Sequence, residues 1–210
     1  MEAIALTPAA EVINNVFFAL DYQILALYHT LALACPWLTP IMVGISYTAK
    51  SGIPLIIASI VMICFKKTRR TGIYCLAGLT VGAILVNVIV KPLIMRPRPY
   101  VFNADIRSWW ALVGSHTESD GSFPSGHTNA AADFSVAFCC ANGKKYIPWA
   151  ILYIVLMGIS RNWLQVHYPS DVLFGMIFGI AAGFIAGSLV SFGYKKFEER
   201  KNIRNANPEK

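Results

Sequence analysis

The sequence predicts an all-α fold, a polytopic membrane bundle of about six transmembrane helices. Of the 210 residues, 56% are hydrophobic and only 14% are charged, and the mean hydropathy is +0.53. The apolar residues come in runs long enough to cross a bilayer, which takes about 20 residues per helix. Basic residues cluster between these runs. Such a chain is too apolar for an ordinary soluble domain and is typical of a multi-span membrane protein.

The apolar runs predict the helices in chain order. The first run is the weakest, because Asp21, Gln23 and His29 interrupt it, and it could instead lie along the membrane interface. The number of spans is therefore open between five and six. The second run carries Lys50 and Pro54 near its middle, where we expect a kink or a break. The predicted spans lie near residues 13–35, 38–65, 71–92, 124–142, 145–161 and 169–194.

No internal repeat or low-complexity linker divides the chain, which predicts one membrane-embedded domain over residues 1–210. Within it, a motif-bearing core covers 71–194 and a basic tail covers 195–210. The N-terminus has no basic segment ahead of a short apolar run, so we expect no removable signal peptide. The five cysteines lack the paired spacing of a zinc site or a disulfide framework and are interpreted as small buried hydrophobes.

Charge predicts which side of the membrane each loop faces, because cytoplasmic loops collect Lys and Arg. Most of the 18 basic residues fall on one side, in 66–70, 144–145 and the tail. We expect that side to be cytoplasmic, so that the loop 93–123 and the turn 162–168 share the extracytoplasmic face. The formal charge of +7 does not indicate nucleic-acid binding, because the apolar runs leave no surface for it.

Two polar clusters precede the turn on that outer face. The segment from Lys91 to Pro99 holds three cations and three prolines within nine residues, more than the snorkelling of an isolated Lys or Arg at a helix end requires. The segment from Phe123 to His127 opens a predicted helix, and the free amides of a helix N-terminus form an anion site that a glycine lets a ligand approach. Read alone, it would be an ordinary helix start.

The third cluster runs from Ser160 to Asp171. It places His167 just before Pro169, the expected start of the last helix, and Asp171 in that helix's first turn. A carboxylate there can fold back and orient the imidazole. Taken singly, these two residues would be an interfacial histidine and a helix-capping acid. The convergence of three polar clusters on one face predicts an active site.

Together the clusters resemble the three-part signature of the type 2 phosphatidic acid phosphatase superfamily, and every position matches. Of the two neighbouring arginines, Arg98 rather than Arg96 has the family's spacing from Lys91. The signature covers residues 91–171, and the helical plan extends the resemblance to nearly the whole chain. The matching positions are Lys91, Arg98-Pro99, Pro124-Ser125-Gly126-His127, Ser160-Arg161, His167 and Asp171.

The resemblance implies a lipid phosphatase that works through a phosphohistidine. His167 would attack the phosphorus, Asp171 would orient it, and His127 would protonate the leaving oxygen and later help to activate water. The resemblance implies neither metal nor other cofactor, and the sequence offers no carboxylate cluster to bind a metal. We therefore predict activity that resists chelators. The phosphoryl oxygens would be held by Lys91, Arg98, Ser125, Gly126 and Arg161.

The resemblance implies a lipid phosphate as partner. Among the family's substrates, it favours for a small chain of this topology a polyprenyl diphosphate such as undecaprenyl diphosphate, dephosphorylated on the extracytoplasmic side of the cell membrane. Phosphatidylglycerol phosphate and phosphatidic acid are alternatives within the family. Two other classes stay open: a vanadate-dependent haloperoxidase, and a non-catalytic protein that binds or transports lipid phosphate. The sequence does not indicate an oligomeric state.

Several polar and aromatic residues fall outside the signature. In the outer loop, Trp109 and Trp110 are assigned to the interfacial aromatic belt. Asp133 lies in mid-helix, where a carboxylate needs a partner, and we hypothesise an ion pair with Lys50. Three exposed polar residues of the same outer loop are placed outside the site: His116, Glu118 and Asp120.

Overall fold

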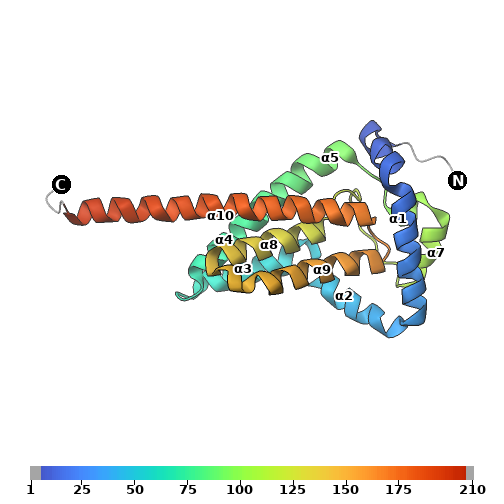
Figure 1. Ribbon diagram of the computed structural model, residues 1–210, viewed down its shortest axis with the longest axis horizontal. Coiled ribbons are helices and arrows are strands. Elements are labelled where there is room, and N and C mark those ends of the chain that lie inside the picture. Colours follow the sequence, from blue (N-terminus) through green and yellow to red (C-terminus); the bar gives the residue numbers. More distant parts are fainter. Residues whose placement is uncertain (1–5, 207–210) are drawn as a thin grey trace.

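The computed structural model describes residues 6–206, and every regular element in that range is a helix, which confirms the all-α prediction. Residues 1–5, which belong to the segment expected to contain no removable signal peptide, and residues 207–210 of the predicted tail lie outside the described residues. In Figure 1, the helices that run along the long axis of the molecule are α3 (Ile53–Cys64), α4 (Arg69–Ala83), α8 (Gly126–Asn142), α9 (Ile147–Trp163) and α10 (Pro169–Ala206). Helix α1 (Pro8–Ala34) crosses one end of the molecule (Figure 1).

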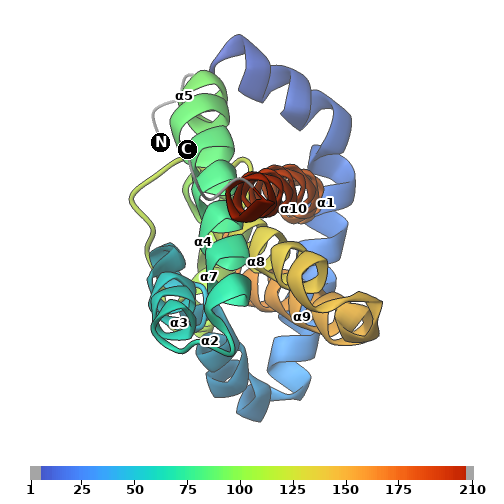
Figure 2. The ribbon, with the colours of Figure 1, turned by 90° about the vertical axis from the view of Figure 1, so that its left-hand side faces the viewer.

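Helix α1 (Pro8–Ala34) begins at Thr7, whose hydroxyl caps it by accepting from the Ala10 amide at 3.2 Å. Its length and composition would allow it to cross a membrane. It nevertheless lies transverse to the bundle, as both ribbon views show (Figures 1 and 2), and contacts α5, α9 and α10. A helix transverse to the others is what the interfacial alternative for the first apolar run predicts, whereas its length and composition also suit the spanning alternative.

The second predicted span is broken where expected. It forms α2 (Thr39–Tyr47) and α3 (Ile53–Cys64), within a stretch from Pro36 to Cys64 that is long and apolar enough to span. Between the two helices the backbone takes positive φ at Ser51 (53°) and Gly52 (70°). These left-handed residues lie just before α3, and Pro54 suits the first turn of that helix.

The third span is α4 (Arg69–Ala83), continued by a π-helical stretch at Ile84–Val90 and by the short α5 (Lys91–Ile94). The predicted outer loop 93–123 contains two helices that were not expected, α6 (Pro99–Phe102) and α7 (Ala104–Leu112). Asn103 starts α7 by accepting hydrogen bonds from two backbone amides. The two tryptophans of α7 pack within the protein, Trp109 on His29 and Trp110 on Tyr100.

Helices α8 (Gly126–Asn142), α9 (Ile147–Trp163) and α10 (Pro169–Ala206) complete the bundle. Because α8 and α9 have 17 residues each, they extend only about 25 Å, at the lower limit for crossing a bilayer. Helix α10 continues well past the predicted end at 194, so most of the predicted basic tail is helical. In Figure 1 this part of α10 projects beyond the rest of the bundle.

Helices α8 and α10 approach closely along a row of glycines in α10. A Cβ atom added at Gly179 would lie 2.4 Å from the carbonyl oxygen of Asn129, and one added at Gly183 would lie 2.8 Å from that of Asp133. Because the glycines are four residues apart, they share one face of the helix. This packing brings the N-terminal ends of α8 and α10 to the same end of the bundle as α1.

Many large apolar side chains of the long helices are exposed, which in this setting is the surface that faces lipid. The connections α3–α4 and α8–α9, which carry basic residues, lie at the end of the bundle away from α1 (Figure 1). Exposed apolar residues include Ile57, Ile60, Ile151, Leu152, Phe184 and Leu189.

Candidate active site

The three sequence motifs meet at the end of the bundle that α1 crosses. The junction of α5 and α6 brings the first motif, the start of α8 the second, and the turn between α9 and α10 the third. They enclose a cavity of about 300 Å³. Residues of the motifs that line it are Lys91, Arg98, Gly126, His127 and His167.

His167 lies in the turn between α9 and α10 and is 1% exposed. Its Nε2 is 2.8 Å from Nη1 of Arg98. Because a guanidinium can only donate, Nε2 is the accepting nitrogen and Nδ1 carries the proton. Burial, together with the positive charges of Arg98 and Arg161, holds the pKa of His167 well below its usual range. The imidazole is therefore neutral at neutral pH, which is the nucleophilic form.

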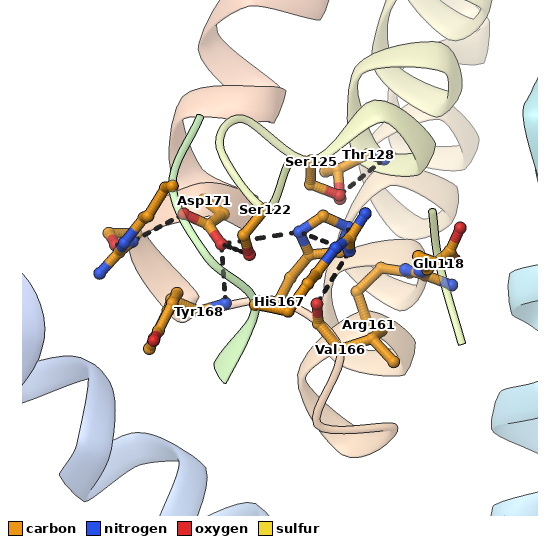
Figure 3. Close-up of polar contacts among 12 residues, drawn as sticks. Glu118, Ser122, Ser125, Thr128, Arg161, Val166, His167, Tyr168 and Asp171 are labelled. Carbon is orange, nitrogen blue, oxygen red and sulfur yellow. Dashed lines mark hydrogen bonds and ion pairs between the residues drawn. The ribbon is translucent and has the colours of Figure 1, made fainter. Parts of the chain in front are cut away.

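Asp171 lies behind this imidazole in the first turn of α10, fully buried (Figure 3). Its Oδ2 is 3.6 Å from Nδ1 of His167, a separation longer than a hydrogen bond, and the contact becomes an ion pair only when the imidazole is charged. The same oxygen accepts from the Ser122 hydroxyl and from the Tyr168 amide at 3.0 Å. Its other oxygen, Oδ1, accepts from Arg96 at 2.7 Å. The carboxylate is thus fixed by groups from three parts of the chain.

The second motif forms the N-terminus of α8. The Ser125 hydroxyl caps the helix: it lies 2.9 Å from the Thr128 hydroxyl and accepts from the Thr128 amide at 3.4 Å. A Cβ at Gly126 would be 3.7 Å from Nζ of Lys91, which places this helix start beside a cation. His127 lines the main cavity and also a second one of about 260 Å³, which reaches Arg161.

Two acidic residues of the outer loop belong to the site, so their placement outside it was wrong. Lys91 forms an ion pair with Asp120, and Nη2 of Arg98 lies 2.5 Å from Oδ1 of the same carboxylate. Arg161 pairs with Glu118 (Figure 3). Burial raises the pKa of Asp120, but the hydrogen bonds and charges of Lys91 and Arg98 outweigh it, and the pKa lies below its usual range.

These contacts follow from charge balance. Lys91, Arg98 and Arg161 are at most 7% exposed, and buried cations require a counter-charge. The signal in the sequence was the presence of two acids on the face that gathers three cations. Arg161 keeps one donor free, since its buried Nε has no hydrogen-bond partner among the described residues. These three cations, Lys91, Arg98 and Arg161, are called the cradle. They have the charge and the donors to hold a phosphate.

The hypothesised pair of Asp133 and Lys50 is wrong. Asp133 is fully buried at the inner end of the main cavity, and its Oδ2 accepts from Nδ2 of Asn129 at 3.1 Å. Lys50 is exposed, with its ammonium 4.7 Å from the centre of the Tyr47 ring. The reason is the break between α2 and α3, which places Lys50 at the second cavity, also lined by His127, rather than at the cavity that Asp133 lines.

Fold and site together define a helical membrane protein whose buried, neutral histidine faces a cluster of cations suited to phosphate. The family model described as the PAP2 superfamily matches residues 71–194, more than half of the chain. The chain belongs to this superfamily, which is the one whose signature the three motifs resemble. Within residues 6–206, no group of three or more His, Cys, Asp or Glu is arranged to hold a metal ion.

Curated relatives and solved structures agree with this assignment. The chain is 31% identical over 172 residues to undecaprenyl-diphosphatase BcrC of Bacillus subtilis, covering 79% of this chain and 82% of that protein. It is 32% identical over 177 residues to phosphatidylglycerophosphatase B of the same organism, covering 79% and 77%. The crystal structure of a transmembrane PAP2-type phosphatidylglycerolphosphate phosphatase from Bacillus subtilis superposes with a TM-score of 0.65 at 29% identity, covering 91% and 90% of the two chains.

Proposed function

We propose that this protein is a metal-independent phosphatase that hydrolyses a lipid diphosphate, of the polyprenyl type, at the extracytoplasmic face of the membrane. The observation that carries the proposal is the neutral, buried imidazole of His167, whose Nε2 faces a cavity ringed by cations. A nucleophile beside positive charge suits attack on a phosphorus, because the charge that develops on the phosphoryl oxygens is stabilised there.

In the first step Nε2 of His167 attacks the phosphorus, and the bond from phosphorus to the leaving oxygen breaks. His127, which lines the same cavity, enters the step as the imidazolium beside the bound phosphate anion and gives its proton to that oxygen. The ring of His167 becomes positively charged as the nitrogen–phosphorus bond forms. Asp171 stabilises that charge from the Nδ1 side, and the three cations of the cradle hold the phosphoryl oxygens.

In the second step a water molecule attacks the phosphorus from the side that the lipid has left. His127, now neutral, takes the proton of the water, and the bond between phosphorus and His167 breaks. Inorganic phosphate leaves and His167 returns to its neutral form. Each step needs only these side chains and water, which is why we expect full turnover in the presence of a chelator.

Two comparisons bear on the substrate. The relative named as an undecaprenyl-diphosphatase supports a polyprenyl diphosphate. The relative and the structure named for phosphatidylglycerophosphate support the second candidate, phosphatidylglycerol phosphate. Sidedness is supported by charge: the site lies at one end of the bundle and the basic connections at the other (Figure 1), and basic loops favour the cytoplasm.

Phosphate release by the purified protein in detergent tests the proposal. The substrates are undecaprenyl diphosphate, phosphatidylglycerol phosphate and phosphatidic acid, each assayed with and without excess chelator. We expect the fastest release from the diphosphate, no loss with chelator, and no release by His167→Ala. Full activity in His167→Ala would refute the catalytic assignment, while loss with chelator that magnesium restores would refute metal independence.

A further inference from the structure

Arg96 is the neighbour of Arg98 that the signature does not use, yet among the described residues it is the largest side chain that is fully buried. Its guanidinium lies 3.7 Å from the centre of the Tyr168 ring. A buried arginine is costly unless its donors are satisfied, and here they are. Nε donates to Asn14 at 2.8 Å, Nη2 to Asp21 at 2.9 Å, and Nη1 to both Ser170 at 2.8 Å and Asp171 at 2.7 Å.

The partners come from two distant parts of the chain. Asn14 and Asp21 belong to the transverse helix α1, whereas Asp171 is at the start of α10, next to the proposed nucleophile. Asp21 also binds α10 directly, since its Oδ1 accepts from the Ser170 amide at 2.8 Å and its Oδ2 from the Ser170 hydroxyl at 2.6 Å. A continuous polar network therefore connects α1 to the carboxylate behind His167.

We propose that Arg96 and Asp21 are positioning residues that act on His167 through Asp171, and that α1 is thereby a working part of the active site. Arg96 holds Oδ1 of Asp171, which leaves Oδ2 directed at Nδ1 of His167. Without this contact Oδ1 loses its arginine partner, and only the Ser122 hydroxyl and the Tyr168 amide still hold the carboxylate through Oδ2, so the imidazole is oriented less firmly.

Charge gives Asp21 its own part in this arrangement. The guanidinium of Arg96 lies between two buried carboxylates, those of Asp21 and Asp171. Because Asp21 neutralises part of the positive charge of Arg96, the negative charge of Asp171 is not cancelled and can act on His167. Removing the charge of Asp21 leaves Arg96 paired with Asp171 alone and weakens the field that stabilises a cationic imidazole. The inference rests on the proposed function, because it concerns the same histidine.

The test is the pair of variants Asp21→Asn and Asp105→Asn. Asp105 is the control: its Oδ2 accepts from the Tyr22 hydroxyl of α1 at 2.9 Å, so its substitution removes the negative charge from another contact of α1 without touching Asp171. We expect Asp21→Asn to lower kcat by about 10- to 100-fold, the effect usual for partners that orient a catalytic group, with KM unchanged. Asp105→Asn leaves both values at the wild-type level.

A double-mutant cycle separates positioning from mere support of α1. In an Asp171→Asn background, Asp21→Asn is expected to change kcat by less than about twofold, because its effect passes through Asp171. Equal losses in Asp21→Asn and Asp105→Asn, or an undiminished loss in the Asp171→Asn background, would overturn the inference. Arg96→Lys is the second variant, since it keeps the charge and is expected to retain KM while lowering kcat.

Failure of the positioning inference can be distinguished from failure of the proposed function. The double-mutant cycle uses enzyme with His167 intact, and His167→Ala is assayed beside it as the test of the proposed function. If that substitution leaves turnover intact, the proposed function fails; if it abolishes turnover and Asp21→Asn has no effect, only the positioning inference fails.

Discussion

At the scale of single residues, the site is organised by the two nitrogens of His167. Nε2 accepts from Arg98 and faces the cavity, whereas Nδ1 faces Asp171. The motif spacing predicted that these residues meet. It did not predict Arg96, Glu118 or Asp120, because their partners lie far away in the chain: Arg96 is 75 residues from Asp21 and from Asp171. Spacing patterns within short segments do not predict contacts between residues that are so far apart in the sequence.

The buried neutral state of His167 predicts a dependence of stability on pH. Its pKa in the folded protein lies well below its usual range, while in the unfolded chain it is about 6.5. Between these values the unfolded chain binds a proton that the folded protein does not. Stability is therefore lost as pH falls below the unfolded value, with a slope of up to about 1.4 kcal/mol per pH unit.

His167→Gln lacks this titration and provides the comparison. We expect the free energy of unfolding of the wild type, minus that of the variant, to decrease as pH falls from about 7.5 to about 5. Denaturant unfolding in detergent at a series of pH values measures it. A difference that stays constant over this range would contradict the buried neutral imidazole.

At the scale of elements, the sequence predicted the helical runs and the break between α2 and α3, because apolar length and Gly and Pro positions determine them. It could not orient α1, since an apolar helix of 27 residues has the composition for crossing a membrane or for lying along it. It missed α6 and α7, which are short and mixed in polarity, and the extension of α10, whose charged residues are good helix formers.

The connection between α7 and α8 supplies the carboxylates that neutralise the cradle. Asp120 bonds Lys91 and Arg98, so its oxygens occupy cation contacts that a phosphate would take. We expect Asp120→Asn to lower the inhibition constant of orthovanadate, a phosphate mimic, by about tenfold, or about 1.4 kcal/mol. Inhibition of phosphate release measures it, with Asp105→Asn as the control. A higher inhibition constant would mean that Asp120 supports the cradle instead of competing for it.

At the scale of the whole molecule, the site and the basic clusters lie at opposite ends of the bundle, which predicts opposite sides of the membrane. Single cysteines at Thr117 and Lys67, both exposed, test this in a chain whose native cysteines are replaced by serine. We expect a membrane-impermeant maleimide to label Thr117→Cys in intact cells, and Lys67→Cys only after the membrane is opened. The reverse pattern would place the site in the cytoplasm. The replaced residues are Cys35, Cys64, Cys75, Cys139 and Cys140.

The central claim is that His167 forms a covalent bond to phosphorus, and trapping that intermediate tests it most directly. Purified protein is mixed with lipid substrate carrying a radioactive reacting phosphorus, then quenched in alkaline denaturant and digested. We expect label on the peptide that contains His167, stable to alkali and labile to acid, and none in His167→Ala. Label that persists in His167→Ala, or active enzyme that never carries label while it turns over, would contradict it.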